Sequence, residues 1–274
     1  QSRSSAASDV YKRQNLYWRR NRDLYLTYLS EIMLQQTTVK TVENKILEII
    51  NIFPSFNSFK NKKLEQLLRV WSGLGYYNRA VNLFKAVTII NNKFNGVLPD
   101  NRDSLISLPG VGTYTSSAIL AIGHNQKAFP IDVNVKRLVE RISGAEFKDN
   151  EVESILSLAC KKKISYRSLA ESMMDFSSII CKKNNPDCDK CKFSNFCKSA
   201  FQKFENNQNT KKINKKIDFY ILNSPLHICF IKKPKFQFYK NFIHLPSNLD
   251  DEFISNIKLR KKEKIKSFKF VITN

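Results

Sequence analysis

Apolar residues recur three and four positions apart along most of the first 204 residues, a spacing that gathers them on one face of an α-helix. Pro and Gly interrupt this pattern in FPSF, SGLGYY, LPGVG and AFPID, as expected of short helix-to-helix connections. The pattern predicts a helical domain over residues 15–204. The clearest stripes are Val39, Val42, Ile46 and Ile49; Ala80, Leu83, Phe84 and Val87; and Val135, Leu138, Val139 and Ile142.

The pattern changes after this domain. Residues 205–216, ENNQNTKKINKK, contain one apolar residue and predict a flexible linker. β-Branched and aromatic residues then alternate in IDFYILN, LHICFIK and FKFVIT, which predicts strands and a small α+β domain over residues 217–274. Residues 1–14 are polar, lack an apolar period and do not begin with Met, so we interpret them as a non-native or disordered leader.

Composition points toward a polyanionic partner. Lys and Arg total 46 against 24 acidic residues, a formal net charge of +22, which is typical of nucleic-acid binding. The alternative is that many lysines only decorate solvated faces. No run approaches the roughly 18 uncharged apolar residues of a membrane helix. We therefore expect a soluble, cytoplasmic protein of bacterial type that associates with the nucleoid rather than with a membrane.

Four cysteines lie close together near the end of the helical region. Cys181, Cys188, Cys191 and Cys197 are separated by six, two and five residues, so one loop can gather four thiolates around a soft metal centre. Structural zinc and an iron–sulfur cluster both fit this spacing. The loop also carries lysines that suit a phosphate backbone. Residues without a companion at ligand or catalytic spacing are Cys160, Cys229, His124, His227 and His244.

Two acidic residues and a glycine-rich turn are candidates for chemistry. The turn Leu108–Gly112 (LPGVG) lies between two predicted helices, and its glycines let backbone amides approach an anion. Asp132 precedes a predicted helix, where an N-cap is the simplest role. Glu31 is flanked by Leu29, Ile32 and Leu34, so partial desolvation should raise its pKa.

Five ordered blocks resemble the adenine DNA glycosylase (MutY) family: SEIMLQQTTVKTV, WSGLGYYNRAVNL, LPGVGTYTSSAIL, PIDVNVKRLVERI and the cysteine spacing. The resemblance covers about Trp18 to Lys198. It implies a mainly α, two-lobed helix–hairpin–helix glycosylase fold, with a six-helix lobe at about 24–130 and an iron–sulfur lobe at about 15–23 and 131–204. It also implies a 4Fe–4S cluster on the four cysteines and a truncated Nudix-like domain at 217–274, where FYKNFIHLP resembles part of the Nudix core.

The resemblance further implies a monofunctional glycosylase that removes adenine mispaired with 8-oxoguanine or guanine. Its partner would be double-stranded DNA containing that mispair, bound by a monomer. Glu31 would protonate the leaving base, and Asp132 would stabilise the oxocarbenium-like sugar. Tyr114 and Asn134 would complete the catalytic set. The resemblance assigns contacts with DNA or the flipped base to Arg19, Leu34, Gln36, Tyr76, Leu108, Gly110, Val111 and Gly112.

Two other functions stay open at this point. An endonuclease III-like glycosylase and lyase for oxidised pyrimidines would need a Schiff-base lysine where this chain has Tyr114. A non-catalytic iron–sulfur DNA-binding protein would be expected to have lost a carboxylate, but Glu31 and Asp132 are both present. One departure from the family is Val133, where relatives usually carry Gly, and we expect it to affect the loop that positions Asp132.

Overall fold

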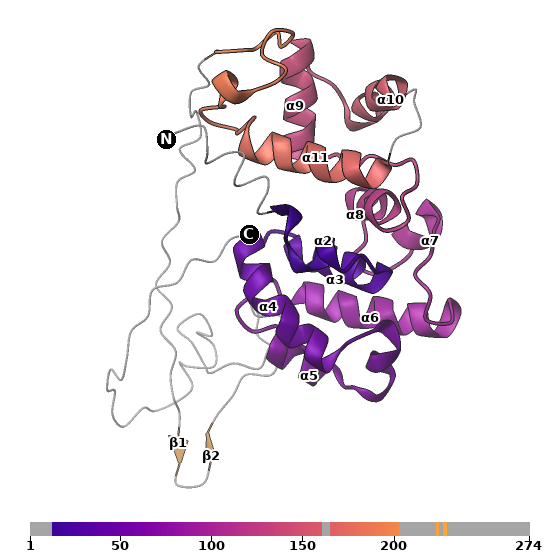
Figure 1. The fold of residues 1–274 in the computed structure, drawn as a ribbon. Helices are drawn as coiled ribbons and strands as arrows, with labels where there is room; N and C mark the ends of the chain where they lie inside the picture. The colour runs from indigo at the N-terminus through magenta and orange to yellow at the C-terminus, as the bar shows by residue number, and fades with distance from the viewer. Residues whose placement is uncertain (1–12, 161–164, 203–222, 225–226, 229–274) are drawn as a thin grey trace, which may run out of the picture. The chain divides into compact units, whose positions relative to one another are not determined.

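The computed structural model describes residues 13–160, 165–202, 223–224 and 227–228. By its internal contacts the chain divides into two units, Gln1–Asn206 and Asn207–Asn274. In the first unit the described residues form helices joined by short turns (Figure 1). The prediction of a mainly helical region is therefore confirmed. The predicted linker and most of the leader lie outside the described residues.

The helices of the first unit follow one another closely along the chain. Each of the three stripes found in the sequence lies on a single helix, namely α4, α6 and α9, as predicted. The elements are α2 (Tyr17–Arg20), α3 (Leu24–Leu34), α4 (Val39–Ile52), η1 (Phe56–Asn61), α5 (Leu64–Val70), α6 (Asn78–Lys93), α7 (Arg102–Ile106), α8 (Thr113–Ala118), the π-helical turn η2 (Ile119–Gly123), α9 (Val133–Ser143), α10 (Asp149–Ala159), α11 (Tyr166–Ile179) and η3 (Cys188–Lys190).

Short polar side chains begin several of these helices. Asp23 accepts a hydrogen bond from the backbone N–H of Leu26 at 2.7 Å, which satisfies one of the free amides at the start of α3. Asn101 and Ser165 cap α7 and α11 in the same way. At its other end α9 stops at Gly144, whose φ of 74° is readily adopted only without a Cβ.

The core of this unit lies beneath α3, α4 and α6. Tyr28, Trp71 and Phe53 are its largest fully buried side chains. Phe53 stacks against Phe59 with ring centroids 4.5 Å apart, and the Tyr25 hydroxyl donates to the Phe53 carbonyl. Because α3 packs into this core, its packing fixes the position of Glu31.

Two groups of helices meet across α2, α3 and α8. Figure 1 shows α9, α10 and α11 together at one end of the unit, and α4, α5 and α6 at the other. The turn η2 contacts both α3 and α11, so it joins the two groups. Arg167 on α11 strengthens this junction by donating to the backbone carbonyls of Ile122 and Gly123. The ends of α3, α8 and α9 consequently meet between the groups.

In the second unit, the described residues form one short antiparallel pair. Strand β1 (Asn223–Ser224) pairs with β2 (His227–Ile228), with Asn223 opposite Ile228 and Ser224 opposite His227. Strand β2 lies within the predicted segment LHICFIK, whereas β1 begins at the last residue of the predicted segment IDFYILN and includes Ser224, just beyond it. The remaining predicted strands and the Nudix-like assignment lie outside the described residues. Among the helices that the structure describes, none is both long and apolar enough to cross a membrane.

Candidate active site

A cavity of about 270 Å³ lies between the two groups of helices. Its volume is near the lower end of the roughly 300–1,000 Å³ typical of pockets for small organic ligands. Its wall carries both apolar and polar side chains, which suits a flat heterocycle with hydrogen-bonding edges. The lining residues are Arg13, Leu16, Trp18, Arg19, Thr27, Ser30, Glu31, Leu34, Thr37, Val39, Tyr114, Ile122, Asp132, Asn134, Glu171, Met174, Asp175 and Ser178.

Glu31 lies on α3 and faces this cavity, with only 6% of its surface exposed. Burial raises the pKa of its carboxyl, the charge of Arg19 partly opposes this rise, and Glu171 adds to it, so that the resulting pKa is about 7. The raised pKa predicted from the apolar neighbours is confirmed. A carboxyl group with this pKa is substantially protonated near neutral pH and can act as a proton donor.

Asp132 reaches the same cavity from the N-terminus of α9. Its Oδ1 accepts from the backbone N–H groups of Asn134 and Val135 at 3.0 and 2.8 Å, and Oδ2 accepts from Asn134 Nδ2 at 2.6 Å. Asp132 is therefore both the helix N-cap and a wall of the cavity. Val133 is 78% exposed in the first position of α9. Asp132 caps the helix with Val133 in place, and the effect of this valine on the loop stays a prediction.

The charges of both acids affect the pKa of Tyr114. Burial raises the pKa of its phenol, and the negative charges of Glu31 and Asp132 raise it further. Its hydroxyl lies 3.9 Å from the sulfur of Met174 and donates toward it. The phenol therefore stays protonated at neutral pH and can donate a hydrogen bond.

Asn134 connects Asp132 to the cysteine loop. Its Oδ1 accepts from Arg137 Nη1 at 2.9 Å, and Arg137 Nη2 donates to the carbonyl oxygens of Cys181 and Ser177, each at 2.7 Å. Burial lowers the pKa of the Arg137 guanidinium. One chain of hydrogen bonds thus joins the carboxylate at the cavity wall to the first of the four cysteines.

Arg19 lines the cavity and forms ion pairs with two acidic residues on α11. Its guanidinium forms a two-pronged ion pair with Asp175 at 2.6 and 3.0 Å and lies 3.9 Å from Glu171. Arg13 also pairs with Asp175, at 3.2 Å. The sequence reasoning missed Glu171 and Asp175. Their four-residue spacing on a helix was a signal, but it gave no indication that they face α2.

The residues predicted to contact DNA divide into two sets. Leu34 lines the cavity with Arg19, whereas Gln36 and Tyr76 lie in turns outside its wall. Both have left-handed backbones, with φ of 55° and 44°. Gln36 is exposed and Tyr76 is half-buried. This conformation is uncommon for residues with a Cβ, and it is often found at functional sites.

The LPGVG turn joins α7 to α8. Leu108 and Val111 are 2% and 6% exposed and anchor the turn in the core. Gly110 has a φ of 80°, and a Cβ at that position would lie 3.0 Å from the Cβ of Asn82. The exposed backbone around Gly110 and Gly112 is the part of the turn that is free to approach a phosphate.

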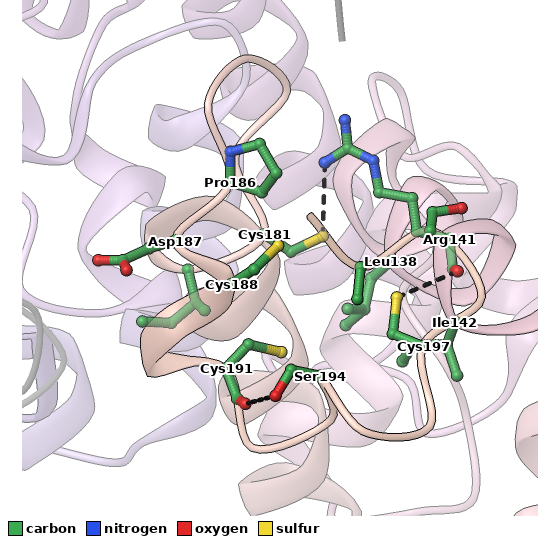
Figure 2. Close-up of a pocket in the computed structure, with 13 residues that line it drawn as sticks. Leu138, Arg141, Ile142, Cys181, Pro186, Asp187, Cys188, Cys191, Ser194 and Cys197 are labelled. Carbon is green, nitrogen blue, oxygen red and sulfur yellow. Dashed lines mark hydrogen bonds between the residues drawn. The ribbon is translucent and has the colours of Figure 1, made fainter. Parts of the chain in front are cut away.

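The four cysteines surround one small pocket of about 20 Å³ (Figure 2). Arg141 Nη1 donates to Cys181 Sγ at 3.5 Å, the backbone N–H of Phe201 donates to Cys188 Sγ at 3.4 Å, and Cys197 Sγ donates to the Arg141 carbonyl at 3.2 Å. Within the described residues no group of three or more His, Cys, Asp or Glu side chains lies close enough to hold a metal ion. The metal centre therefore stays a prediction, although four soft donors that face one pocket suit it chemically.

The fold and the turn place the chain in a known class. Residues 29–162 match the family model of the HhH-GPD superfamily of base excision DNA repair proteins. The chain is 34% identical over 274 residues to an adenine DNA glycosylase of Buchnera aphidicola subsp. Schizaphis graminum, covering 92% of this chain and 75% of that protein. This chain belongs to the adenine DNA glycosylase family.

Other relatives agree with this assignment. The adenine DNA glycosylase of Buchnera aphidicola subsp. Baizongia pistaciae is 36% identical over 242 residues, which cover 86% of this chain. The match spans 65% of that protein, so the chain covers slightly less than two thirds of its length. A thermostable thymine-DNA glycosylase has a similar structure, with a TM-score of 0.61, 28% identity, and coverage of 70% of this chain and 94% of that one. An endonuclease III bound non-covalently to DNA has a TM-score of 0.58 at 25% identity, covering 65% of this chain and 85% of the other.

Proposed function

We propose that this protein is a monofunctional DNA glycosylase that hydrolyses the N-glycosidic bond of adenine mispaired with 8-oxoguanine or guanine. The observation that carries the proposal is the convergence of Glu31, Asp132 and Tyr114 on one cavity of base-like size. A proton donor and an ionisable carboxylate on one cavity are the groups that glycoside hydrolysis requires. The names of the Buchnera relatives support adenine as the base.

A base inside a duplex cannot reach Glu31, so the nucleotide must leave the stack and enter the cavity. The surplus of basic side chains favours binding to the phosphate backbone, and the turn around Gly110 offers exposed backbone to one phosphate. Gln36 and Tyr76, which lie in turns outside the cavity, fill and probe the gap that the base leaves.

Adenine is a poor leaving group because it must depart with the electrons of the glycosidic bond. Glu31 donates its proton to a ring nitrogen of the base, and adenine then leaves as a neutral molecule. The pKa of about 7 makes the donor protonated near neutral pH and still acidic enough to give up its proton. Apolar neighbours on α3 maintain this protonated state by excluding water.

Departure of the base leaves positive charge on the sugar. Asp132, held by two backbone amides and by Asn134, presents a carboxylate that stabilises this charge. A water molecule supplies the hydroxyl group that replaces adenine, and its second proton restores the protonated acid. The products are free adenine and an abasic site in an unbroken strand.

The lyase alternative requires an amine that attacks the sugar. No lysine occurs among the described residues that line the cavity, and the position that such a lysine would need is occupied by Tyr114. A phenol has no amine nitrogen, so it cannot form a Schiff base. The lining residues therefore favour a reaction through water.

A 4Fe–4S cluster would be held by Cys181, Cys188, Cys191 and Cys197. Bound there, the cluster would supply a structural cross-link that holds the loop after α11 together. Lysines interleave with these ligands, so the loop carries positive charge toward a phosphate backbone. The hydrogen bonds from Arg137 to Cys181 and Asn134 would then transmit the order of the loop to Asp132.

To test this proposal, purified protein is incubated with four duplexes in turn. They carry adenine opposite 8-oxoguanine, adenine opposite guanine, thymine opposite guanine, and thymine glycol opposite adenine. The third duplex tests the activity named for the similar thymine-DNA glycosylase. Each product is analysed with and without alkali, because alkali breaks the strand at an abasic site. We expect loss of adenine from the first two duplexes, with strand breakage only after alkali.

A Glu31→Gln variant is the matched control, since it keeps the size and polarity of the side chain but cannot donate the proton. It should bind the same duplexes while losing excision. Strand breakage of the thymine glycol duplex without alkali would replace the proposal with the lyase. Binding without excision of any base would favour the non-catalytic alternative.

A further inference from the structure

Arg79 is a buried cation that the catalytic proposal leaves without a role. It lies at the start of α6 with 8% of its surface exposed and does not line the cavity. Burial lowers its pKa to about 10, well above neutral pH, so the guanidinium keeps its charge. Its Nη1 donates to the carbonyls of Ile32, Met33 and Gln35 at 3.1, 2.6 and 2.6 Å. Its Nη2 donates to Thr37 Oγ1 and to the carbonyls of Leu74 and Gly75 at 2.9, 3.0 and 3.2 Å.

These acceptors belong to two segments that are distant in the sequence. The first is the end of α3 with the turn after it, where carbonyl groups have no partner within the helix. The second is the turn that precedes α6. The guanidinium also stacks near the rings of Trp71 and Tyr76, with its central carbon 5.4 and 5.6 Å from the ring centroids. The Arg79 side chain therefore links the turn after α3 to the turn before α6.

The two turns contain the residues assigned to insertion into DNA. Gln36 has a φ of 55° and lies between Gln35 and Thr37, which both accept from Arg79. Tyr76 has a φ of 44° and directly follows Gly75, whose carbonyl also accepts from Arg79. Left-handed backbone persists at residues with a Cβ only where the surroundings hold it. The bonds of Arg79 are placed to hold both.

We propose that Arg79 is a positioning residue that joins residues 35–37 and 74–76 into one rigid unit, so that Gln36 and Tyr76 enter the DNA together. The inference rests on the proposed function, in which these two side chains occupy the gap left by the flipped base. Arg79 touches no reacting atom. Its effect on the reaction is exerted through the geometry of the two turns.

Lysine cannot replace arginine in this role. A guanidinium is planar and directs its two terminal nitrogens to separate sets of acceptors, whereas an ammonium is a single point with a different geometry. Arg79→Lys therefore preserves the charge and loses the connection between the turns. Misplacement of reacting groups by about 1 Å can cost on the order of a hundredfold in rate, so a loss of tenfold to a hundredfold is expected.

The test is a double-mutant cycle between Arg79→Lys and Gln36→Ala on the full chain. The probe is a duplex with 2-aminopurine at the target position, whose fluorescence rises when the base leaves the stack, together with the single-turnover rate of adenine excision. Alone, Arg79→Lys should reduce both signals. In the Gln36→Ala background its further loss should be smaller than its loss in the wild-type protein, because one of the two side chains that it positions is already gone and coupled residues are not additive.

Arg167→Lys is the matched control, because Arg167 also donates to two backbone carbonyls, those of Ile122 and Gly123, but contacts neither turn. Its effect should multiply with that of Gln36→Ala. Thr37→Val is a milder variant that removes one acceptor of Arg79 and tests the same coupling if Arg79→Lys folds poorly. Independent, multiplicative losses for Arg79→Lys, or for Thr37→Val in its place, overturn the inference.

The outcome is separable from that of the proposed function. If the wild-type protein removes no adenine, the proposed function fails, but the fluorescence still decides the role of Arg79, because base extrusion precedes any bond cleavage. If the wild-type protein excises adenine and the Arg79 and Gln36 effects multiply, the proposed function stands and the positioning role fails.

Discussion

Replacing Glu31 with Gln should make the protein more stable at alkaline pH while abolishing its activity. Glu31 is 6% exposed, and its pKa is raised from 4.5 to about 7, mainly by burial. The native protein therefore holds a proton that the unfolded chain releases between these two values. Stability from this group is complete below pH 4.5 and is lost as the pH rises toward 7.

The difference between 4.5 and about 7 corresponds to about 3 kcal/mol, fully expressed above pH 7. Gln cannot ionise, so Glu31→Gln should exceed wild type in stability by about 2–3 kcal/mol more at pH 8 than at pH 5. For a domain of this size that is a rise of roughly 4–12 °C in Tm relative to wild type. The protein therefore gives up part of its free energy of unfolding to keep a catalytic acid in this cavity.

The assay is thermal unfolding of both proteins across pH 5–8, followed by circular dichroism. Other titrating groups are common to both proteins and cancel in the difference. Glu43→Gln, a change at an exposed position on α4, is the control and should parallel wild type throughout. If the difference between Glu31→Gln and wild type does not change with pH, then Glu31 does not have a raised pKa and the account of the proton donor is wrong.

Three further predictions concern the rest of the site. Asp132→Asn should retain the cap of α9, because Asn and Asp cap helices about equally, yet lose on the order of a hundredfold or more in excision rate; unchanged activity with an unchanged Tm would remove Asp132 from the mechanism. The single-turnover rate should fall as the pH rises above about 7, where Glu31 loses its proton, and a rate that instead rises through this range would identify a base as the essential group. Purified protein should be brown and contain iron, and Cys188→Ser should lose both properties, whereas stoichiometric zinc in a colourless protein would show that the structural-zinc alternative is correct.

Much of the helical scaffold follows from local pattern alone. The apolar stripes at 39–49, 80–87 and 135–142 lie on α4, α6 and α9, because a helix that packs against a core must bury one face whatever its partner is. The rise in the pKa of Glu31 was also foreseeable, since apolar residues surround it in the same helix. The N-cap at Asp132 was predictable as well, because Asp often precedes the first turn of a helix.

Other parts of the site depend on contacts that no local pattern describes. In the sequence, Glu171 and Asp175 look like ordinary polar residues of an amphipathic helix, and only the packing of α11 against α2 pairs them with Arg19. Arg79 is similar, because an arginine near the start of a helix is usually exposed. Its burial follows from two turns that fold over it from different parts of the chain.

By itself, the sequence determined the helices, the caps, the acidic residue in an apolar setting and the spacing of four cysteines, because each depends on neighbours within a few positions. Tertiary structure decided which side chains share the cavity and that Arg79 joins the turns bearing Gln36 and Tyr76. These features require groups far apart in the chain to meet at hydrogen-bonding distance. Such encounters are set by the packing of whole helices.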